Sequence, residues 1–244
     1  MNESELSNFV AQRLEDFYRR RLQKLTELKL NQTLRKKNPY LFRAVGVMKA
    51  CEIVESLLQA YMSSSEETIF GDAFFEPIVK EVCSGVAAGG TGVDVVIETQ
   101  DTYTVISVKS GPNWGNSSQM EKLRQDFNTA YHVFSNKKLK KNFKALLGHC
   151  YGQKQGEPTP KRAYAIRSGQ AFWTEITGDP DFYLKLIHAM GKLPVIHRAL
   201  YEQEWNKALN RFEREFLNEF STPYGEIDWE KLLRFNSGIK SQKI

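Results

Sequence analysis

The stretch "TVISVKSG" at residues 104–111 predicts a β-strand that ends in polar residues. Val105, Ile106 and Val108 are β-branched and apolar, which is typical of a buried strand. Ser107 and Lys109 alternate with them just before a glycine and proline turn. Burying an unpaired ammonium costs several kcal/mol. Lys109 therefore needs a partner at the end of this strand.

A second strand-like segment supplies that partner. Residues 93–100 (VDVVIETQ) and 102–109 (TYTVISVK) are both rich in β-branched residues and are separated by a single residue, which predicts an antiparallel hairpin. Asp94 then lies opposite the end of the second strand. Alternation of side chains puts Ser107 and Lys109 on one face of that strand. The sequence thus predicts that a carboxylate and an ammonium meet, each stabilising the charged form of the other.

Helical patterns precede the hairpin. Apolar residues recur at helical spacing over residues 3–30 and again in a helix that we expect to end near Met62. Ser64 and Glu67 then fit a capping box that opens a further helix. A glycine-rich turn at 85–92 leads into the hairpin.

A helix and two more strands follow the hairpin. Ser118 and Glu121 fit the capping box of the helix, residues 143–152 and 162–169 have the composition of strands, and helical patterns return from Gln170. This order predicts an α/β fold with a mixed sheet covered by helices on both faces.

Composition excludes several classes of protein. The chain has no run of eighteen apolar residues and its first segment is charged, so we expect neither a membrane span nor a secretory signal. Its three cysteines are far apart and have no zinc spacing. They predict reduced thiols in a cytoplasmic protein.

The positive charge is concentrated in two clusters. The formal net charge is +5, and residues 19–43 hold nine Lys or Arg residues but a single acid, Glu27. Residues 136–144 add five lysines and no acid. Either cluster alone is typical of a solvated surface, but together they favour a polyanionic partner such as nucleic acid.

The polar cluster resembles the signature of the PD-(D/E)XK nucleases. In that superfamily an Asp and an acid-X-Lys triplet stand on neighbouring strands behind a helix, as Asp94 and the triplet ending in Lys109 do here. Two positions depart from the pattern: Val93 replaces the proline, and Ser107 replaces the acid. The resemblance implies an αβββαβ core with helical extensions at both ends.

Longer segments resemble a bacterial type II restriction endonuclease family, the PmeII-like group. The similarity covers roughly residues 34–190 and implies one endonuclease domain over 1–244, with a helical region (1–64), a nuclease core (65–170) and C-terminal helices (171–244). The similar segments are NPYLFRA (38–44), SSSEETIFGDAFFE (63–76), VKSGPNWGNSSQ (108–119), LGHCYG (147–152) and GQAFWTEITGD (169–179).

The missing acid must come from another position, because Ser107 carries no negative charge. Some members of the superfamily, the NgoMIV-like enzymes, combine Ser-X-Lys with an acid on the following helix. Glu121 has such a position, although it also fits the helix cap. Glu76, on the apolar stripe of the preceding helix, is the second candidate, since a carboxylate there needs a partner or a metal. Glu98 is a weaker candidate.

The resemblance also implies the chemistry. Mg²⁺ would be held by Asp94, by Glu76 or Glu121 and by the carbonyl of Val108, and would activate a water for phosphodiester hydrolysis. Lys109 would orient that water and balance charge in the transition state. Ser107 would form a hydrogen bond with a metal-bound water. Products would carry 5′-phosphates.

Three segments are candidates for contact with double-stranded DNA. Residues 35–38 should contact phosphates, the loop 110–118 should lie near the cut phosphate or a groove, and the loop 153–162 has side chains suited to base edges. The candidates are Arg35, Lys36, Lys37, Asn38, Asn113, Trp114, Asn116, Ser117, Gln153, Lys154, Gln155, Lys161, Arg162, Arg167, Ser168 and Gln170.

These features predict a site-specific endonuclease. Cutting both strands of a palindromic site favours a homodimer, and a restriction enzyme implies a cognate DNA methyltransferase. Two alternatives remain: a structure-specific or repair nuclease of the same fold, and a DNA-binding protein inactivated by Ser107. The histidines show no metal spacing or catalytic arrangement and receive no role; they are His132, His149, His188 and His197.

Overall fold

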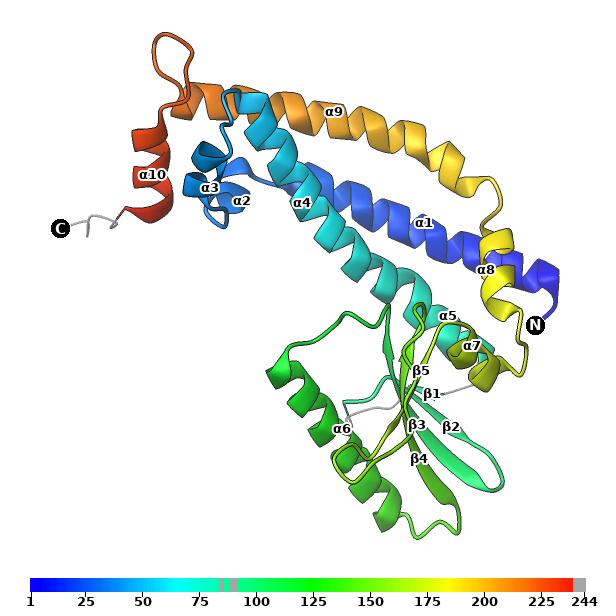
Figure 1. Cartoon of the computed structure of the whole chain (residues 1–244). Coiled ribbons are helices and arrows are strands. Elements are labelled where there is room, and N and C mark those ends of the chain that lie inside the picture. The colour runs from blue at the N-terminus through cyan, green and yellow to red at the C-terminus, as the bar shows by residue number, and fades with distance from the viewer. Residues whose placement is uncertain (84–85, 88–91, 239–244) are drawn as a thin grey trace. The chain divides into compact units, whose positions relative to one another are not determined.

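The computed structural model describes residues 1–83, 86–87 and 92–238 (Figure 1). The chain forms two compact units: unit 1 comprises Met1–Phe17 and Thr68–Leu193, and unit 2 comprises Tyr18–Glu67 and Pro194–Ile244. Most of the glycine-rich turn predicted at 85–92 falls outside the described residues. One endonuclease domain over the whole chain stays a prediction.

Unit 1 is built around a mixed sheet with the strand order β1-β2-β3-β4-β5 in the described residues. The strands β1 (Val86–Ala87), β2 (Val95–Glu98) and β3 (Thr102–Lys109) pair antiparallel in sequence order. β4 (Asn142–His149) lies parallel to β3, and β5 (Ala165–Ser168) lies parallel to β4. The predicted α/β class and mixed sheet are confirmed.

The register of the hairpin brings the polar residues together. Val95 pairs with Ile106, and the Asp94 N–H donates to the carbonyl of Ile106 at 2.9 Å, which extends the pairing one residue beyond β2. Asp94 therefore lies beside Ser107, as the sequence predicts. On the other side of β3, the parallel register places Lys109 next to His149.

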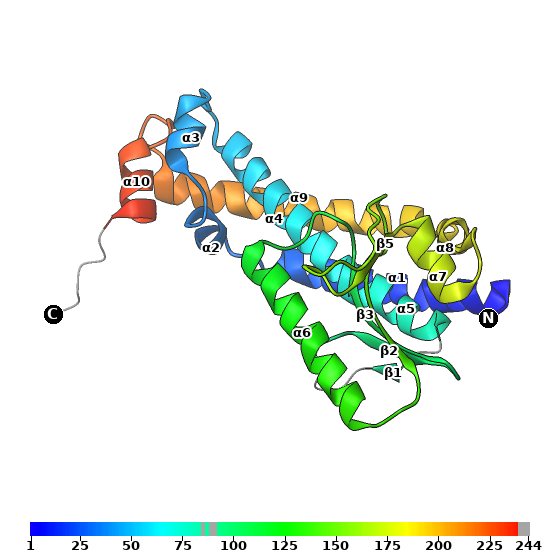
Figure 2. The same cartoon turned by 60° about the horizontal axis from the view of Figure 1, so that its bottom comes forward.

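Helices cover both faces of the sheet (Figures 1 and 2). On one face, α6 (Ser117–Asn136) buries Leu123 and Phe127 in one hydrophobic cluster with Val105. On the other face, α7 (Gln170–Thr177) places Phe172 against Gly148 of β4. Helix α8 (Phe182–Met190) follows in the same unit.

The helical segment before the sheet differs from the expectation. α4 (Ala50–Phe70) continues into a π-helical turn, η1 (Gly71–Phe75), and then into α5 (Glu76–Val82). The predicted helix end and the capping box of Ser64 and Glu67 are wrong, since both residues lie inside α4. A capping box can only serve the first turn of a helix, where N–H groups lack intrahelical acceptors.

The cap of α6 is also two residues earlier than predicted. The Gln119 N–H donates to Asn116 Oδ1 at 3.0 Å, and the Asn116 N–H donates to Gln119 Oε1 at 2.9 Å. Asn is as favourable an N-cap as Ser, so the sequence contains two overlapping candidates for the capping box, and the structure has the earlier one. The prediction of a capping box from Ser118 and Glu121 is wrong, and Glu121 has no capping role.

Unit 2 is helical in its described residues. Its own core includes Leu25, Ile53, Leu57, Phe212 and Phe216, all fully buried. The described helices include none that is long and apolar enough to cross a membrane. The segments that contribute to this unit are the last part of α1 (Glu3–Glu27) from Tyr18 on, α2 (Leu30–Leu34), α3 (Pro39–Ala44), most of α4, nearly all of α9 (Leu193–Phe220) and α10 (Trp229–Ser237).

The contact between β4 and α7 yields a stability prediction. A Cβ added at Gly148 would lie 2.1 Å from a ring carbon of Phe172, so Gly148→Ala forces the ring or the strand to move. We expect this variant to lose about 1–3 kcal/mol in the free energy of unfolding, measured by urea denaturation. Phe172→Leu removes the clashing ring edge, so the double variant should lose less than the sum of the single variants. Strict additivity would contradict the proposed contact.

Candidate active site

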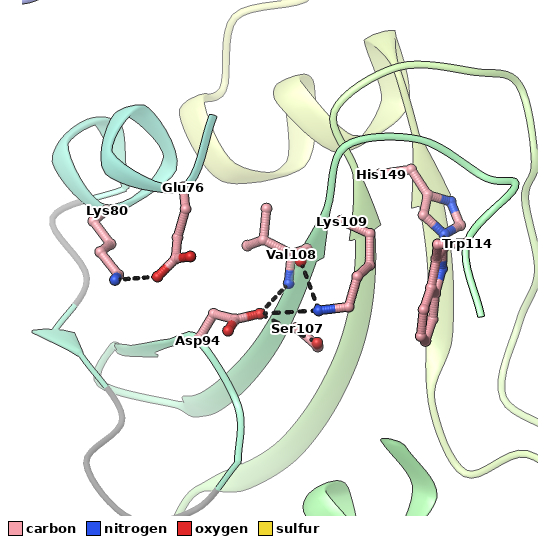
Figure 3. A network of polar contacts seen from close by, with 8 residues as sticks. All are labelled: Glu76, Lys80, Asp94, Ser107, Val108, Lys109, Trp114 and His149. Atoms are coloured by element: carbon pink, nitrogen blue, oxygen red, sulfur yellow. Dashed lines mark hydrogen bonds and ion pairs between the residues drawn. The ribbon is translucent and has the colours of Figure 1, made fainter. Parts of the chain in front are cut away.

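Asp94 is the centre of the polar cluster at the end of β3 (Figure 3). Its Oδ2 accepts a hydrogen bond from the Val108 N–H at 2.6 Å and one from the Ser107 hydroxyl at 3.2 Å. Ser107 itself is buried, with 2% of its surface exposed. Two donors thus fix the carboxylate in one orientation. Asp94 belongs to the short segment before β2, and the register of the hairpin sets its position.

Lys109 completes the cluster from the last position of β3. Its Nζ donates to the Val108 carbonyl at 2.9 Å and lies 3.7 Å from Asp94 Oδ2. The Trp114 ring lies on another side of the ammonium, with its centroid 5.4 Å from Nζ, within the range of a cation–π contact. The ammonium is therefore held between a carboxylate, a carbonyl and an aromatic ring.

The oxygen atoms around Lys109 fit a hard divalent cation. The ammonium shows that Asp94 Oδ2 and the Val108 carbonyl converge on a single positive charge. Carboxylate and carbonyl oxygens are the ligands that Mg²⁺ prefers, and Mg²⁺ usually binds through only one or two carboxylates and retains several waters. Within the described residues there is no group of three or more His, Cys, Asp or Glu side chains that could enclose a metal. The donor set suits an open site rather than a closed cage.

Glu76 faces Asp94 from the preceding helix. It is the first residue of α5 and forms an ion pair with Lys80 one turn later. Figure 3 shows the Glu76 carboxylate on the side of the helix turned toward Asp94 and Val108. About a third of its side chain is exposed, at 34%. It is the second carboxylate at this end of the sheet.

Glu121 and Glu98 have other partners. Glu121 is exposed on α6 and pairs with Arg124 one turn later on the same helix. Glu98, at the far end of β2, pairs with Lys141 at 2.7 Å, and this hydrogen bond lowers the pKa of the Glu98 carboxyl. The described contacts place neither residue beside Asp94. Of the predicted site residues, the structure brings together Asp94, Ser107, Val108 and Lys109, with Glu76 facing them.

Comparison with known families adds an independent finding. The model of the type II restriction endonuclease EcoO109I family matches residues 4–194, about three quarters of the chain. The chain belongs to the EcoO109I family of type II restriction endonucleases. A comparison with curated proteins found no match. Family membership makes the chain a nuclease, hence a hydrolase that acts on DNA.

The loop that follows β3 in this EcoO109I-family endonuclease has some side chains that are exposed to solvent and others that contact the protein. Asn113 is exposed, and Ser117 is exposed in the first turn of α6, where Asn116 is the N-cap. Trp114 turns inward, and its Nε1–H donates to His149 Nε2 at 2.9 Å. Asn113 and Ser117 thus stay available for DNA, whereas Trp114 has a partner within the protein.

The loop between β4 and β5 presents most of its predicted contacts to solvent. Gln153, Lys154, Gln155 and Lys161 are exposed. Arg162 is half-buried, and its Nε donates to a main-chain carbonyl two residues further along at 3.2 Å. Four of the five candidates in this loop are therefore exposed, and of these Gln155 Nε2 donates to the Ser168 carbonyl at 3.3 Å.

The residues at the end of β5 have bonding partners within unit 1. Arg167 pairs with Glu157 at 2.8 Å and with Glu175 at 3.1 Å. Gln170 donates to a main-chain carbonyl at 3.0 Å while its side chain stays exposed. Ser168 is buried, with 2% of its surface exposed, so its expected contact with DNA is wrong. Burial follows from alternation in β5, which turns Ser168 to the inside.

The first basic cluster belongs to unit 2. Arg35, Lys36 and Asn38 are exposed around α2 and α3, and Lys37 is half-buried. The Arg35 guanidinium lies 4.9 Å from the centroid of the Phe235 ring. Asn38 accepts a hydrogen bond at the start of α3 and so caps this helix.

A hollow of unit 1 is separate from the polar cluster. A cavity of about 770 Å³ is lined mainly by aromatic and aliphatic side chains, together with Gln153, Gln155 and Gln170. Neither Asp94 nor Lys109 lines it. Its lining residues include no carboxylate, so it does not have the oxygen donors of the polar cluster.

Sequence reasoning missed His149. It is fully buried at the end of β4, where it accepts from Trp114 and its Nδ1 lies 2.8 Å from Ser168 Oγ. Burial, and then the charges of Lys154 and Lys109, lower the pKa of His149 to about 4. The one local signal was a histidine directly following the apolar run ALLG (145–148).

The lowered pKa of His149 predicts an acid-dependent loss of stability. In the unfolded chain the pKa is about 6.5, so between pH 6.5 and 4 protons bind the unfolded state in preference to the folded state. The contribution of His149 to the free energy of unfolding is complete above pH 6.5 and is lost as the pH falls toward 4. We expect the free energy of unfolding to fall between pH 7.5 and 5 by about 2 kcal/mol more in the wild type than in His149→Asn, measured by urea denaturation. Parallel pH profiles would contradict a buried neutral histidine.

Proposed function

We propose that this family member is a site-specific endonuclease that uses Mg²⁺ to cut double-stranded DNA and leaves 5′-phosphates. The convergence of Asp94 Oδ2 and the Val108 carbonyl on the Lys109 ammonium is the observation that supports this proposal best. It gives a carboxylate, a carbonyl and a fixed positive charge at one end of the sheet, which are the groups that metal-assisted phosphodiester hydrolysis needs.

Each residue of the cluster has a proposed role. Asp94, the Val108 carbonyl and Glu76 would hold the metal. Bound Mg²⁺ would supply Lewis acidity toward the scissile phosphate and lower the pKa of a bound water. Lys109 would move from the carbonyl, orient the attacking water and balance the negative charge that develops on the phosphate. Ser107 would keep the Asp94 carboxylate oriented, since its hydroxyl donates to Oδ2 at 3.2 Å.

We propose a Ser-X-Lys variant of the PD-(D/E)XK site in which Glu76 replaces the missing acid. Glu76 faces Asp94 in Figure 3, whereas Glu121 is exposed and pairs with Arg124. Moving the acid to the preceding helix keeps two carboxylates near the metal while Ser107 occupies the usual acidic position. Glu121 is the alternative that the sequence favours.

The proposed DNA contacts and partners follow from exposure and from the reaction. The exposed side chains of the loop 153–162 would contact base edges, Asn113 and Ser117 would lie near the cut phosphate, and residues 35–38 would contact the phosphate backbone. A homodimer would cut both strands of a palindromic site. A methyltransferase of matching specificity would protect the host DNA. The narrower PmeII-like assignment, a cytoplasmic location and a single endonuclease domain stay predictions.

Substitutions at the two charged groups test the proposal. Asp94→Asn keeps a hydrogen-bond acceptor and removes the charge, and Lys109→Met keeps the length of the side chain and removes the ammonium. Each should lower the rate of plasmid cleavage in Mg²⁺ by at least about a hundredfold, because each removes a charge that acts in the transition state. Agarose gels of a time course give the rate.

Lys185→Met is the matched control. Lys185 also pairs with a carboxylate, Asp179, but it belongs to α8 and is not one of the candidate DNA contacts, so this variant should cut at the wild-type rate. Normal cleavage by Asp94→Asn or Lys109→Met would remove the proposed site. Cutting of branched substrates alone would favour a repair nuclease, and a mobility shift without cutting would favour an inactive DNA-binding protein.

A second pair of variants identifies the relocated acid. Glu76→Gln should slow single-turnover cleavage by at least about tenfold and raise the Mg²⁺ concentration needed for half-maximal rate, since it removes a metal ligand. Glu121→Gln loses only an exposed ion pair and should stay within about twofold of the wild type. The reverse result would transfer the role to Glu121. Full activity in both variants would refute a relocated acid.

A further inference from the structure

A chain of hydrogen bonds runs through the interior of unit 1 beside the proposed active site. The Trp114 Nε1–H donates to His149 Nε2 at 2.9 Å, His149 Nδ1 lies 2.8 Å from Ser168 Oγ, and the Ser168 hydroxyl donates to the carbonyl of Lys154 at 2.6 Å. His149 is fully buried and Ser168 is 2% exposed. The central bond of the chain is therefore buried away from water, and the two outer bonds are partly buried.

The chemistry of the four groups allows one arrangement of the protons. An indole nitrogen can only donate, so His149 Nε2 accepts and carries no proton. A neutral imidazole then holds its proton on Nδ1 and donates it to Ser168. The hydroxyl proton of Ser168 is left for Lys154. Each donor and acceptor is used once, and all bonds point from Trp114 toward the loop that follows β4.

The two ends of this chain lie at two different functional elements. At one end, the Trp114 ring lies against the Lys109 ammonium, 5.4 Å from Nζ to the centroid. At the other end lies the loop 153–162, and Gln155 Nε2 also donates to the Ser168 carbonyl at 3.3 Å. The amine beside Asp94 and the exposed loop are thus connected through one buried imidazole.

We propose that His149 is a positioning residue that couples the DNA-contacting loop to the catalytic lysine. Through Nε2 it fixes the Trp114 indole, and the indole keeps the Lys109 ammonium at the end of β3. Through Nδ1 and Ser168 it fixes the main chain of Lys154. The position of the loop on DNA is thereby linked to the position of the ammonium. This inference rests on the proposed function, because it assigns Lys109 a role in cleavage.

Two substitutions cut the chain at different bonds. The amide nitrogen of Asn takes the place of Nδ1, so His149→Asn can still donate to Ser168 but cannot reach Trp114. The amide oxygen of Gln takes the place of Nε2, so His149→Gln can still accept from Trp114 but loses Ser168. A purely structural role predicts similar effects for the two variants, whereas the coupling predicts different ones.

The experiment measures single-turnover plasmid cleavage in Mg²⁺, normalised to folded protein, and the affinity for the same DNA without metal. We expect His149→Asn to slow cleavage by about tenfold while its DNA affinity stays within about twofold, since one positioning bond is lost. We expect His149→Gln to cut close to the wild-type rate but to produce additional fragments at related sequences. Trp114→Phe, which keeps a ring and removes the donor, should behave like His149→Asn.

Two outcomes would overturn the inference: wild-type rate and specificity in His149→Asn, or equal losses in both variants that disappear after correction for folded protein. Failure of the proposed function is a separate outcome, in which the wild-type protein itself cuts no DNA. The bond can be observed without activity, in NMR spectra of ¹⁵N-tryptophan-labelled protein. The Trp114 indole signal, assigned from its loss in Trp114→Phe, should keep its position in His149→Gln and shift in His149→Asn. A shift of equal size in both variants would contradict the proposed bond.

Discussion

The interaction between Lys109 and the oxygen atoms of Asp94 and Val108 is the constraint on which the rest of the site depends. An ammonium at the end of a buried strand is costly unless charged or polar groups surround it. Here the carbonyl of Val108 in its own strand accepts at 2.9 Å, and the carboxylate of Asp94, directly before the neighbouring strand β2, lies at 3.7 Å. Any shift of the hairpin register would separate these groups, since moving a strand by one residue turns its side chains to the other face. The same pairing that builds the sheet therefore builds the site.

The layers around the sheet hold this end of β3 in place. Helix α6 buries an apolar stripe against one face of the sheet, and α7 packs Phe172 onto Gly148 on the other face. Helix α5, which precedes the sheet, carries Glu76. The loop from β3 to α6 returns Trp114 to the lysine, where buried His149 fixes its indole. A rigid sheet thus supports polar groups that would otherwise be mobile, and preorganisation of this kind is what transition-state stabilisation requires.

Local patterns in the sequence were sufficient for the hairpin and for the cluster of Asp94, Ser107 and Lys109. A period of two and a short connection predict this pairing without any knowledge of distant segments. The expected single-residue connection is wrong, since residues 99–101 join β2 to β3. The predicted helix boundaries were wrong because several polar residues in a row offer more than one possible N-cap. Asn116 with Gln119 and Ser118 with Glu121 both fit the rule, and only packing decides between them. Likewise, the polar run around Ser64 lies inside a continuous helix.

The groups that sequence reasoning could not place depend on long-range contacts. His149 bonds to Trp114, 35 residues earlier, and to Ser168, 19 residues later, so no short motif includes all three. The choice between Glu76 and Glu121 similarly depends on which helix face turns toward β3, and spacing along the chain favoured Glu121. Ser168 was expected at a DNA surface, yet its position in β5 turns it inward.

A crystal soaked in Mn²⁺, with anomalous scattering recorded, shows whether these oxygen atoms bind a metal ion. We expect one strong anomalous peak within coordination distance of Asp94 Oδ2 and the Val108 carbonyl, with the Lys109 ammonium displaced from that carbonyl. Absence of a peak beside Asp94, or an Asp94 side chain turned away from Lys109, would contradict the proposed metal site.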